Sequence, residues 1–404
     1  MPMIPAQWFR ISSLPALAIA MLAGCGGGGG GVDCPPGGAR CGTSYDVTSP
    51  TAVDSSQTFA TISIGNWHTC MTSTTGAAWC WGSNDHGQLG AASAQHCMGG
   101  NIDCSAVPLA VGGMQAFVGI ASSSVHSCGL TAAGAAWCWG IAAQLGNGGA
   151  GSGAVRVPVA VAGGHAFKKI VASTSAPMTC AFEADGSPWC WGSGFSFGTK
   201  GPMPSTTPLR WDAIASVAWT QFAIGQGHAC GLDAVGKAWC VGSSFNGLLG
   251  DGGGEASATP VAVAGGHVFQ EIVAAIEHTC ALTVDGQAWC WGQGAGLGNG
   301  GPVGTVQPTP VAVAGGLHLV HLAAGNGRTC GLAADGSAWC WGEGYGGNLG
   351  DGTTAQRLTP VAVAGGHHFV ALGSGGISTC GIDTAGKAWC WGSNETGAIG
   401  VPMP

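Results

Sequence analysis

The clearest pattern of apolar and polar positions lies at residues 278–292, which read His-Thr-Cys-Ala-Leu-Thr-Val-Asp-Gly-Gln-Ala-Trp-Cys-Trp-Gly. Two short apolar runs flank a turn that contains Asp and Gly, and this arrangement predicts a β-hairpin. A three-residue loop would place Gly286 at the left-handed position of a type I turn and would set Cys280 opposite Cys290. A two-residue Asp-Gly turn would move the cysteines out of opposition. Because opposed Cβ atoms lie within disulfide reach, we predict the longer loop and a cross-strand disulfide.

The same hairpin occurs seven times along the chain. Each copy carries two cysteines ten residues apart, with a Gly four residues before the second Cys and a Trp directly before it. Successive copies are 58, 52, 50, 50, 50 and 50 residues apart, and a period of this length indicates a solenoid or a propeller. We predict one disulfide within each copy, which joins Cys70 with Cys80, Cys128 with Cys138, Cys180 with Cys190, Cys230 with Cys240, Cys280 with Cys290, Cys330 with Cys340, and Cys380 with Cys390.

Each copy contains about four short strands, which is the size of one propeller blade. A Pro-Val-Ala-Val-Ala-Gly-Gly-His-x-Phe run precedes the hairpin at 260–269 and 360–369, and a Gly-rich segment that ends in Leu-Gly follows it, as at 82–90. These motifs resemble the repeats of the regulator-of-chromosome-condensation family, and residues 65–90 match most of that pattern. The resemblance covers residues 49–400 and implies an all-β fold, a seven-bladed β-propeller with four-stranded blades.

Several positions depart from the repeat. Met178, Arg328 and Ser378 replace the His that stands two residues before the first Cys in the other copies. The fourth copy has Val241 in place of the second Trp, and residues 209–212 break its upstream Val-Ala-Val run. The blades are therefore expected to differ locally at these places.

The first residues have the proportions of an export signal. Arg10 is the only charge before the apolar run at 14–23, which is too short to span a bilayer as a mature helix. The run ends in Leu-Ala-Gly-Cys, which resembles the lipobox of bacterial lipoproteins and implies that Cys25 becomes a lipidated N-terminus. By the same resemblance, Gly26 in place of Asp favours the outer membrane. An ordinary secretory signal that contains a Cys is the alternative.

These features divide the chain into a signal peptide at 1–24, a lipidated Cys with a Gly-rich tether at 25–48, and the propeller at 49–404. We expect the two ends of the propeller segment to complete one blade together and close the ring. The predicted location is the bacterial cell envelope.

Composition narrows the class of function. The 404 residues include only 11 Lys and Arg and 19 Asp and Glu, and a net charge of −8 without a basic cluster argues against nucleic-acid partners.

Of the 19 cysteines, those outside the hairpins are Cys25, Cys34, Cys41, Cys97 and Cys104. Cys34 can pair locally with Cys41, and Cys97 with Cys104, which leaves no free thiol and requires an oxidising compartment. Metal binding is the alternative, but the hairpin pairs lack the tight Cys-x₂₋₄-Cys spacing, and we predict no metal site.

Motifs of known catalytic classes are absent or occur only as letter matches. The Gly-x-Ser-x-Gly letters at 194–198 lie in the Gly-rich segment that follows a hairpin of the repeat, and the chain has no His-Glu-x-x-His and no P-loop. The Gly-x-Gly-x-x-Gly letters at 342–347 follow no βαβ pattern, so we regard the match as coincidental. The repeat histidines His68, His126, His228 and His278 are expected to bond the backbone or pack between blades. We predict a protein that is not an enzyme and uses no cofactor.

Information about function should lie where the repeat varies. Five residues after each second Cys stand Asp85, Ala143, Phe195, Phe245, Ala295, Tyr345 and Glu395. Ring geometry places these positions on one face, around the axis, and Trp67 belongs to a second variable position before the first Cys. Variable, partly aromatic side chains on a rigid scaffold are typical of a recognition surface. The alternative is that the aromatic side chains only fill gaps between blades.

We therefore predict a monomeric, envelope-anchored binding module that engages a protein or a glycan through one propeller face. A structural or adhesion component without a specific soluble ligand is the alternative. The family that the repeats resemble includes a nucleotide-exchange factor and a secreted β-lactamase inhibitor, so the fold does not fix the partner. A lyase or hydrolase would need convergent acids, for which Asp85 and Glu395 are the only adjacent pair. The insertion at 91–107 is either an additional contact element or a stiffened loop.

Overall fold

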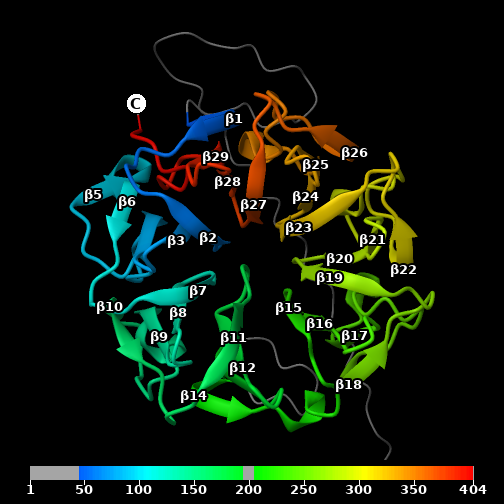
Figure 1. Cartoon of the computed structure of the whole chain (residues 1–404), viewed down its shortest axis with the longest axis horizontal. Coiled ribbons are helices and arrows are strands. Elements are labelled where there is room, and N and C mark those ends of the chain that lie inside the picture. The colour runs from blue at the N-terminus through cyan, green and yellow to red at the C-terminus, as the bar shows by residue number, and fades with distance from the viewer. Residues whose placement is uncertain (1–44, 194–203, 404) are drawn as a thin grey trace, which may run out of the picture. The chain divides into compact units, whose positions relative to one another are not determined.

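Each copy of the repeat forms an antiparallel β-sheet in the computed structural model, which describes residues 45–193 and 204–403. The seven sheets are arranged as blades around a central axis (Figure 1). The innermost strands of neighbouring blades contact each other in sequence order, and the last contacts the first, which closes the ring. The predicted seven-bladed, all-β propeller is therefore confirmed. None of the helices in the described residues is long and apolar enough to cross a membrane.

The strands of each blade are given from the axis outward. Blade one contains β2 (Phe59–Ile64), β3 (His68–Ser73), β4 (Ala78–Ser83), β6 (Ile102–Ala110) and a fifth strand, β5 (Gln95–Cys97). Blade two contains β7 (Phe117–Ser122), β8 (His126–Thr131), β9 (Ala136–Ile141) and β10 (Ala154–Ala160), and blade three contains β11 (Phe167–Ala172), β12 (Met178–Glu183), β13 (Pro188–Gly192) and β14 (Ser205–Arg210). Blade four contains β15 (Gln221–Ile224), β16 (His228–Leu232), β17 (Ala238–Gly242) and β18 (Ser257–Ala262), and blade five contains β19 (Phe269–Ala274), β20 (His278–Thr283), β21 (Ala288–Gly292) and β22 (Gln307–Ala312).

The last two blades complete the ring. Blade six contains β23 (Leu319–Gly325), β24 (Arg328–Ala333), β25 (Ala338–Gly342) and β26 (Arg357–Ala362), and blade seven contains β27 (Phe369–Ser374), β28 (Ser378–Asp383), β29 (Ala388–Ser393) and β1 (Asp46–Ala52). Short 3₁₀ turns lie in the connections: η1 (Met98–Gly100), η2 (Ala142–Gln144), η4 (Asp212–Ile214), η5 (Phe245–Gly247), η6 (Ala295–Leu297) and η7 (Tyr345–Gly347).

The hairpin register agrees with the three-residue loop. Cys280 pairs with Cys290, and the Thr283 backbone N–H donates to the Gln287 carbonyl at 2.9 Å. Gly286 has a φ of +84°, in the left-handed region that L side chains avoid. The same opposition of cysteines recurs in every hairpin of the ring.

All seven predicted hairpin disulfides are confirmed. They join Cys70 with Cys80, Cys128 with Cys138, Cys180 with Cys190, Cys230 with Cys240, Cys280 with Cys290, Cys330 with Cys340, and Cys380 with Cys390. The predicted local pair of Cys97 with Cys104 is present as well. Each blade therefore carries one cross-strand disulfide in its hairpin, and blade one carries a second disulfide in its insertion.

The two ends of the propeller segment meet in blade seven. Strand β1 pairs antiparallel with β29, so the N-terminal segment supplies the outermost strand to three strands from the C-terminal end. Pairing begins at Asp46, opposite Ser393, a few residues before position 49. Closure by strands from opposite ends of the chain joins the blades into a ring without an open edge between the first and the last.

Neighbouring blades cover both faces of each sheet. Cys280 and Cys290 are fully buried and pack in one cluster with Trp341, the second Trp of the next copy. The same contact between a disulfide and the second Trp of the following blade recurs at Trp81, Trp139, Trp191, Trp291 and Trp391. Burial of an aromatic ring against each disulfide is therefore a recurrent hydrophobic contact between blades.

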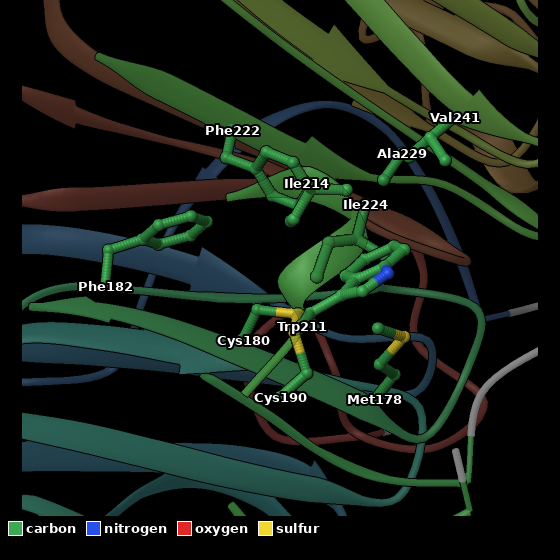
Figure 2. Packing of buried hydrophobic residues seen from close by; sticks show 10 residues of the cluster. All are labelled: Met178, Cys180, Phe182, Cys190, Trp211, Ile214, Phe222, Ile224, Ala229 and Val241. Atoms are coloured by element: carbon green, nitrogen blue, oxygen red, sulfur yellow. A yellow bond between two sulfur atoms is a disulfide. The ribbon is translucent and has the colours of Figure 1, made fainter. Parts of the chain in front are cut away.

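Two departures from the repeat compensate for each other between blades three and four. Val241, which replaces the second Trp, is too small to cover the disulfide between Cys180 and Cys190. Trp211, from the irregular segment between the two blades, joins that cluster and is 1% exposed. Figure 2 shows the Trp211 ring beside the disulfide. A residue 30 positions before Val241 thus fills the space that the repeat assigns to a Trp.

This compensation predicts a coupled pair of substitutions. We expect Trp211→Ala to lower the free energy of unfolding by about 3–5 kcal/mol, because Val241 cannot fill the cavity. Val241→Trp alone should cost about 1–3 kcal/mol through overpacking against Trp211. In the double variant the new Trp should occupy the vacated space and restore part of the loss. Unfolding midpoints in denaturant, measured for the native chain, both single variants and the double variant, test this prediction. If the losses of the two single variants simply added in the double variant, the two Trp positions would not share one space.

Candidate functional site

The strand order assigns the connections of each blade to two faces of the ring. The turn between the first and second strands and the loop between the third and fourth strands leave at one end of the sheet, which we call the loop face. The hairpin turn and the connection to the next blade leave at the other end, which we call the turn face. Both sets of variable positions therefore belong to the loop face.

Three of the candidate residues line one pocket of the loop face. Trp67, Asp85 and Glu395 border a cavity of about 440 Å³ at the joint between blades seven and one. We call this cavity the joint pocket. Trp67 is 40% exposed, and its backbone carbonyl accepts a hydrogen bond from the Thr396 hydroxyl at 3.2 Å, which links the two blades. Ring closure thus brings together residues that are more than 300 positions apart.

The insertion at 91–107 forms one wall of the joint pocket. Met98 and Ile102 line the cavity, and the disulfide between Cys97 and Cys104 ties β5 to β6 beside them. The backbone N–H of Asp103, in β6, donates to the Asp85 carboxylate at 2.7 Å. Of the two roles considered for the insertion, its place in the wall favours that of an additional contact element.

The other variable positions have different surroundings. Phe245 is 73% exposed and borders a second cavity of about 280 Å³ with Ile276 and Glu277 of the next blade. Tyr345 is 42% exposed, whereas Ala295 is buried in η6. The exposure of Phe245 contradicts the alternative that its ring only fills a gap between blades. Four residues of the sequence predictions lie outside the described residues: Phe195, Cys25, Cys34 and Cys41.

Contrary to the expectation from the sequence, the variable positions after the second Cys do not lie around the axis. The innermost strands line the central channel, a cavity of about 280 Å³ bordered by residues such as Ile120, Ile170 and Phe222. The variable positions after the second Cys follow the third strand of each blade, so they lie toward the outside of the ring. Only the turns after the first strands, such as the one that carries Trp67, lie close to the axis. A blade is four strands wide, and the loop after its third strand is separated from the channel by the first two.

One aromatic residue of the loop face was missed from the sequence. Tyr45 is 38% exposed and precedes β1, in the segment assigned to the tether. It lines a cavity of about 500 Å³ with His96, Met98 and Glu395, next to the joint pocket. Two signals could have identified Tyr45 from the sequence. It stands directly before a strand-like segment, and it is one of only two tyrosines in the chain.

The repeat histidines join neighbouring blades. Nε2 of His68, His126, His228 and His278 lies 2.6–2.8 Å from a Ser or Thr hydroxyl of the next blade. Burial lowers the pKa of His68 and His126 to about 3, with a further contribution to His68 from His126, and it lowers the pKa of His228 and His278 to about 4. These side chains are neutral structural links, as their expected place between blades suggested.

Arg328 makes the corresponding link between blades six and seven. Its Nε donates to the Thr379 hydroxyl at 3.2 Å, and its other nitrogens donate to the carbonyls of Gly375, Gly376 and Ser378 at 2.7–3.1 Å. Burial lowers the pKa of Arg328 to about 9. The guanidinium has five donors, which suit a site lined by carbonyls. Arg328 therefore replaces the repeat histidine in position and in role.

The described residues contain no group of three or more His, Cys, Asp or Glu side chains placed to hold a metal ion. The loop face instead carries aromatic rings and carboxylates in loops and turns at the ends of the strands. Such a surface suits recognition of another molecule through stacking, ion pairing and hydrogen bonds.

Sequence comparison identifies the repeat. The regulator of chromosome condensation (RCC1) repeat matches residues 59–88 and 274–295 in one form and residues 75–130 in another. No curated protein sequence matches the chain. The matched segments lie in blades one, two and five of the seven-bladed β-propeller.

Solved structures agree with this fold. Human WBSCR16 is 17% identical with a TM-score of 0.72, and the alignment covers 86% of this chain and 90% of that one. Prp20p from Saccharomyces cerevisiae is 18% identical with a TM-score of 0.67, over 86% of this chain and 83% of that one. The ectodomain of the Arabidopsis thaliana receptor kinase ACR4 is 18% identical with a TM-score of 0.52, over 86% and 98%. At these identities the similarity concerns the fold alone.

Proposed function

We propose that the propeller is a non-enzymatic binding module that engages a protein partner through its loop face. One observation carries the proposal: among the described residues, the four large aromatic side chains that are exposed, Tyr45, Trp67, Phe245 and Tyr345, all belong to this face. Exposed aromatic residues on a rigid scaffold are the usual anchors of protein interfaces. A structure of Prp20p was solved in a study of its binding to Gsp1p and histones, and another shows Kap60 bound to Prp20, so propellers of this fold can bind proteins.

The proposal includes attachment to a membrane of the cell envelope through a lipid on Cys25, as the lipobox-like segment suggests. The seven hairpin disulfides support it, because disulfides of this number are typical of oxidising compartments. A glycan partner and a purely structural role are the alternatives. A specific partner distinguishes binding from a structural role, and loss of binding after protease treatment of that partner distinguishes protein from glycan.

Cross-linking on intact cells tests the loop face. We expect a cross-linked partner with the native chain and at least a tenfold lower yield with Phe245→Ala/Tyr345→Ala, because hot-spot aromatic residues commonly contribute about 2 kcal/mol or more. Val235→Ala/Val284→Ala, which removes two exposed side chains of the turn face, is the matched control and should leave the yield unchanged. Cys25→Ser should release the protein from the membrane fraction. Equal yields from the loop-face and turn-face variants would refute the face assignment.

A further inference from the structure

The loop face is rich in carboxylates. Nine acidic residues stand at strand ends or in loops of this face: Asp46, Asp85, Asp103, Asp251, Glu255, Glu277, Glu343, Asp351 and Glu395. They come from blades one, four, five, six and seven, so the negative charge is spread around the ring rather than confined to one loop. A surface of one sign attracts partners of the opposite sign and steers their approach.

The described basic side chains do not balance this charge. Among the described residues, three arginines come to the loop face: Arg156 pairs with Asp103 at 3.0 Å, Arg357 pairs with Asp351 at 2.7 Å, and Arg328 is fully buried. The remaining described basic residues belong to the turn face: Lys168, Lys169, Arg210, Lys237 and Lys387. The described part of the loop face therefore combines an excess of negative charge with the exposed aromatic rings.

The joint pocket concentrates both properties. Trp67 lies in its lining with Asp85 and Glu395, and neither carboxylate forms an ion pair with a basic side chain of the described residues. One oxygen of Asp85 accepts the Asp103 N–H, which holds this carboxylate in place. The lining contains no arginine and no lysine, and His86 is its one imidazole.

We propose that the joint pocket binds the side chain of an arginine carried by a basic segment of the protein partner. A guanidinium is planar, so it stacks on the Trp67 indole and donates to carboxylates at its edge. A lysine ammonium is a compact, strongly hydrated charge and uses the same pocket less well. Met98 and Ile102 in the wall suit the methylene stem of an arginine. This inference rests on the proposed function and specifies the chemistry of its partner.

Binding of labelled peptides to the intact chain tests the proposal. Fluorescein-labelled heptaarginine, heptalysine and heptaglutamate are titrated and followed by fluorescence anisotropy. We expect heptaarginine to bind most tightly, heptalysine more weakly and heptaglutamate not at all. Trp67→Ala and Asp85→Asn/Glu395→Gln should each weaken heptaarginine binding about tenfold, while Trp67→Phe should weaken it less because it keeps a ring. Binding should weaken as salt rises toward about 0.15 M.

Asp54→Asn/Asp335→Asn is the matched control, because it removes two exposed charges from the turn face. It should change heptaarginine affinity less than twofold, and circular dichroism checks that every variant is folded. An equal loss in the control and in Asp85→Asn/Glu395→Gln would assign binding to diffuse charge and overturn the proposal. Equal affinity for heptaglutamate would overturn it as well. If cross-linking still depends on Phe245 and Tyr345, only this inference fails and the proposed function stands.

Discussion

A chain refolded with its cysteines reduced should remain unfolded, whereas the native protein should keep its hairpin disulfides in the same reductant. Each disulfide joins cysteines ten positions apart. Closing a loop of that size removes conformational entropy from the unfolded chain, which stabilises the folded state by about 2–3 kcal/mol at 25 °C. Seven such loops amount to roughly 20 kcal/mol as an upper bound, which exceeds the about 5–15 kcal/mol by which ordinary proteins are stable. Without the disulfides the folded state should not be populated.

The native disulfides should resist reduction for a different reason. The hairpin cysteines are all fully buried between blades, and thiol–disulfide exchange needs access of a thiolate to the sulfur. Alkylation followed by mass measurement counts the reduced cysteines, and far-ultraviolet circular dichroism reports folding. Reductant together with denaturant is the control and should expose every hairpin cysteine. A reduced chain that regains the native spectrum and unfolds cooperatively would contradict the argument.

Lowering the pH from 7.5 to 5 should destabilise the propeller strongly. His68, His126, His228 and His278 have folded-state pKa values of about 3 to 4 because of burial, while an unfolded chain has about 6.5. Between these values the unfolded state binds protons that the folded state does not, so stability falls as the pH drops below about 6.5. At pH 5 each histidine accounts for about 2 kcal/mol, or about 8 kcal/mol together as an upper bound.

The hydrogen bonds explain why these histidines stay neutral. Nδ1 of His68 and of His278 is buried and has no hydrogen-bond partner in the described part of the chain. Protonation would place an N–H there without an acceptor, in addition to the cost of a buried charge. One group acts in the opposite direction: burial lowers the pKa of His321, but the hydrogen bond and charge of Glu271 outweigh it and raise the pKa. His321 therefore offsets part of the loss.

Denaturant unfolding with the disulfides intact, at several pH values from 7.5 to 5, measures the effect. His228→Gln/His278→Gln keeps a polar group at both joints and removes about half of the titrating sites, so it should flatten the pH dependence by about half. His321→Gln is a second control and should steepen it. A stability that does not change between pH 7.5 and 5 would show that the folded histidines accept protons.

Much of the fold follows from the local pattern. The Asp-Gly turn allows two registers, and the expected opposition of the cysteines selects the three-residue loop that the structure contains. Seven copies of a four-strand unit, each apolar on both faces, can bury those faces only by packing on one another. Local steric and periodicity arguments therefore suffice for the blades, the disulfides and the number of blades.

The same local arguments predict less of the candidate functional site. Trp67 and Phe245 were found because they vary at fixed positions of the repeat, but their depth and neighbours depend on loops without a period. Tyr45 was placed in the tether because its role depends on β1, whose partner β29 is more than 300 residues away. The position of variable residues toward the outside of the ring follows from which strand lies innermost, and this depends on contacts between blades.

The sequence by itself determined the repeated unit, its hairpin register, the pairing of its cysteines and the positions at which side chains vary. These are properties of neighbouring residues, and short-range geometry decides them. Only the tertiary structure decided that Trp211 covers the space left by Val241, that Arg328 bonds the Thr379 hydroxyl of the next blade as a repeat histidine would, and that Trp67, Asp85 and Glu395 share one pocket. Each of these depends on contacts between neighbouring blades, and the joint pocket in addition depends on closure of the ring.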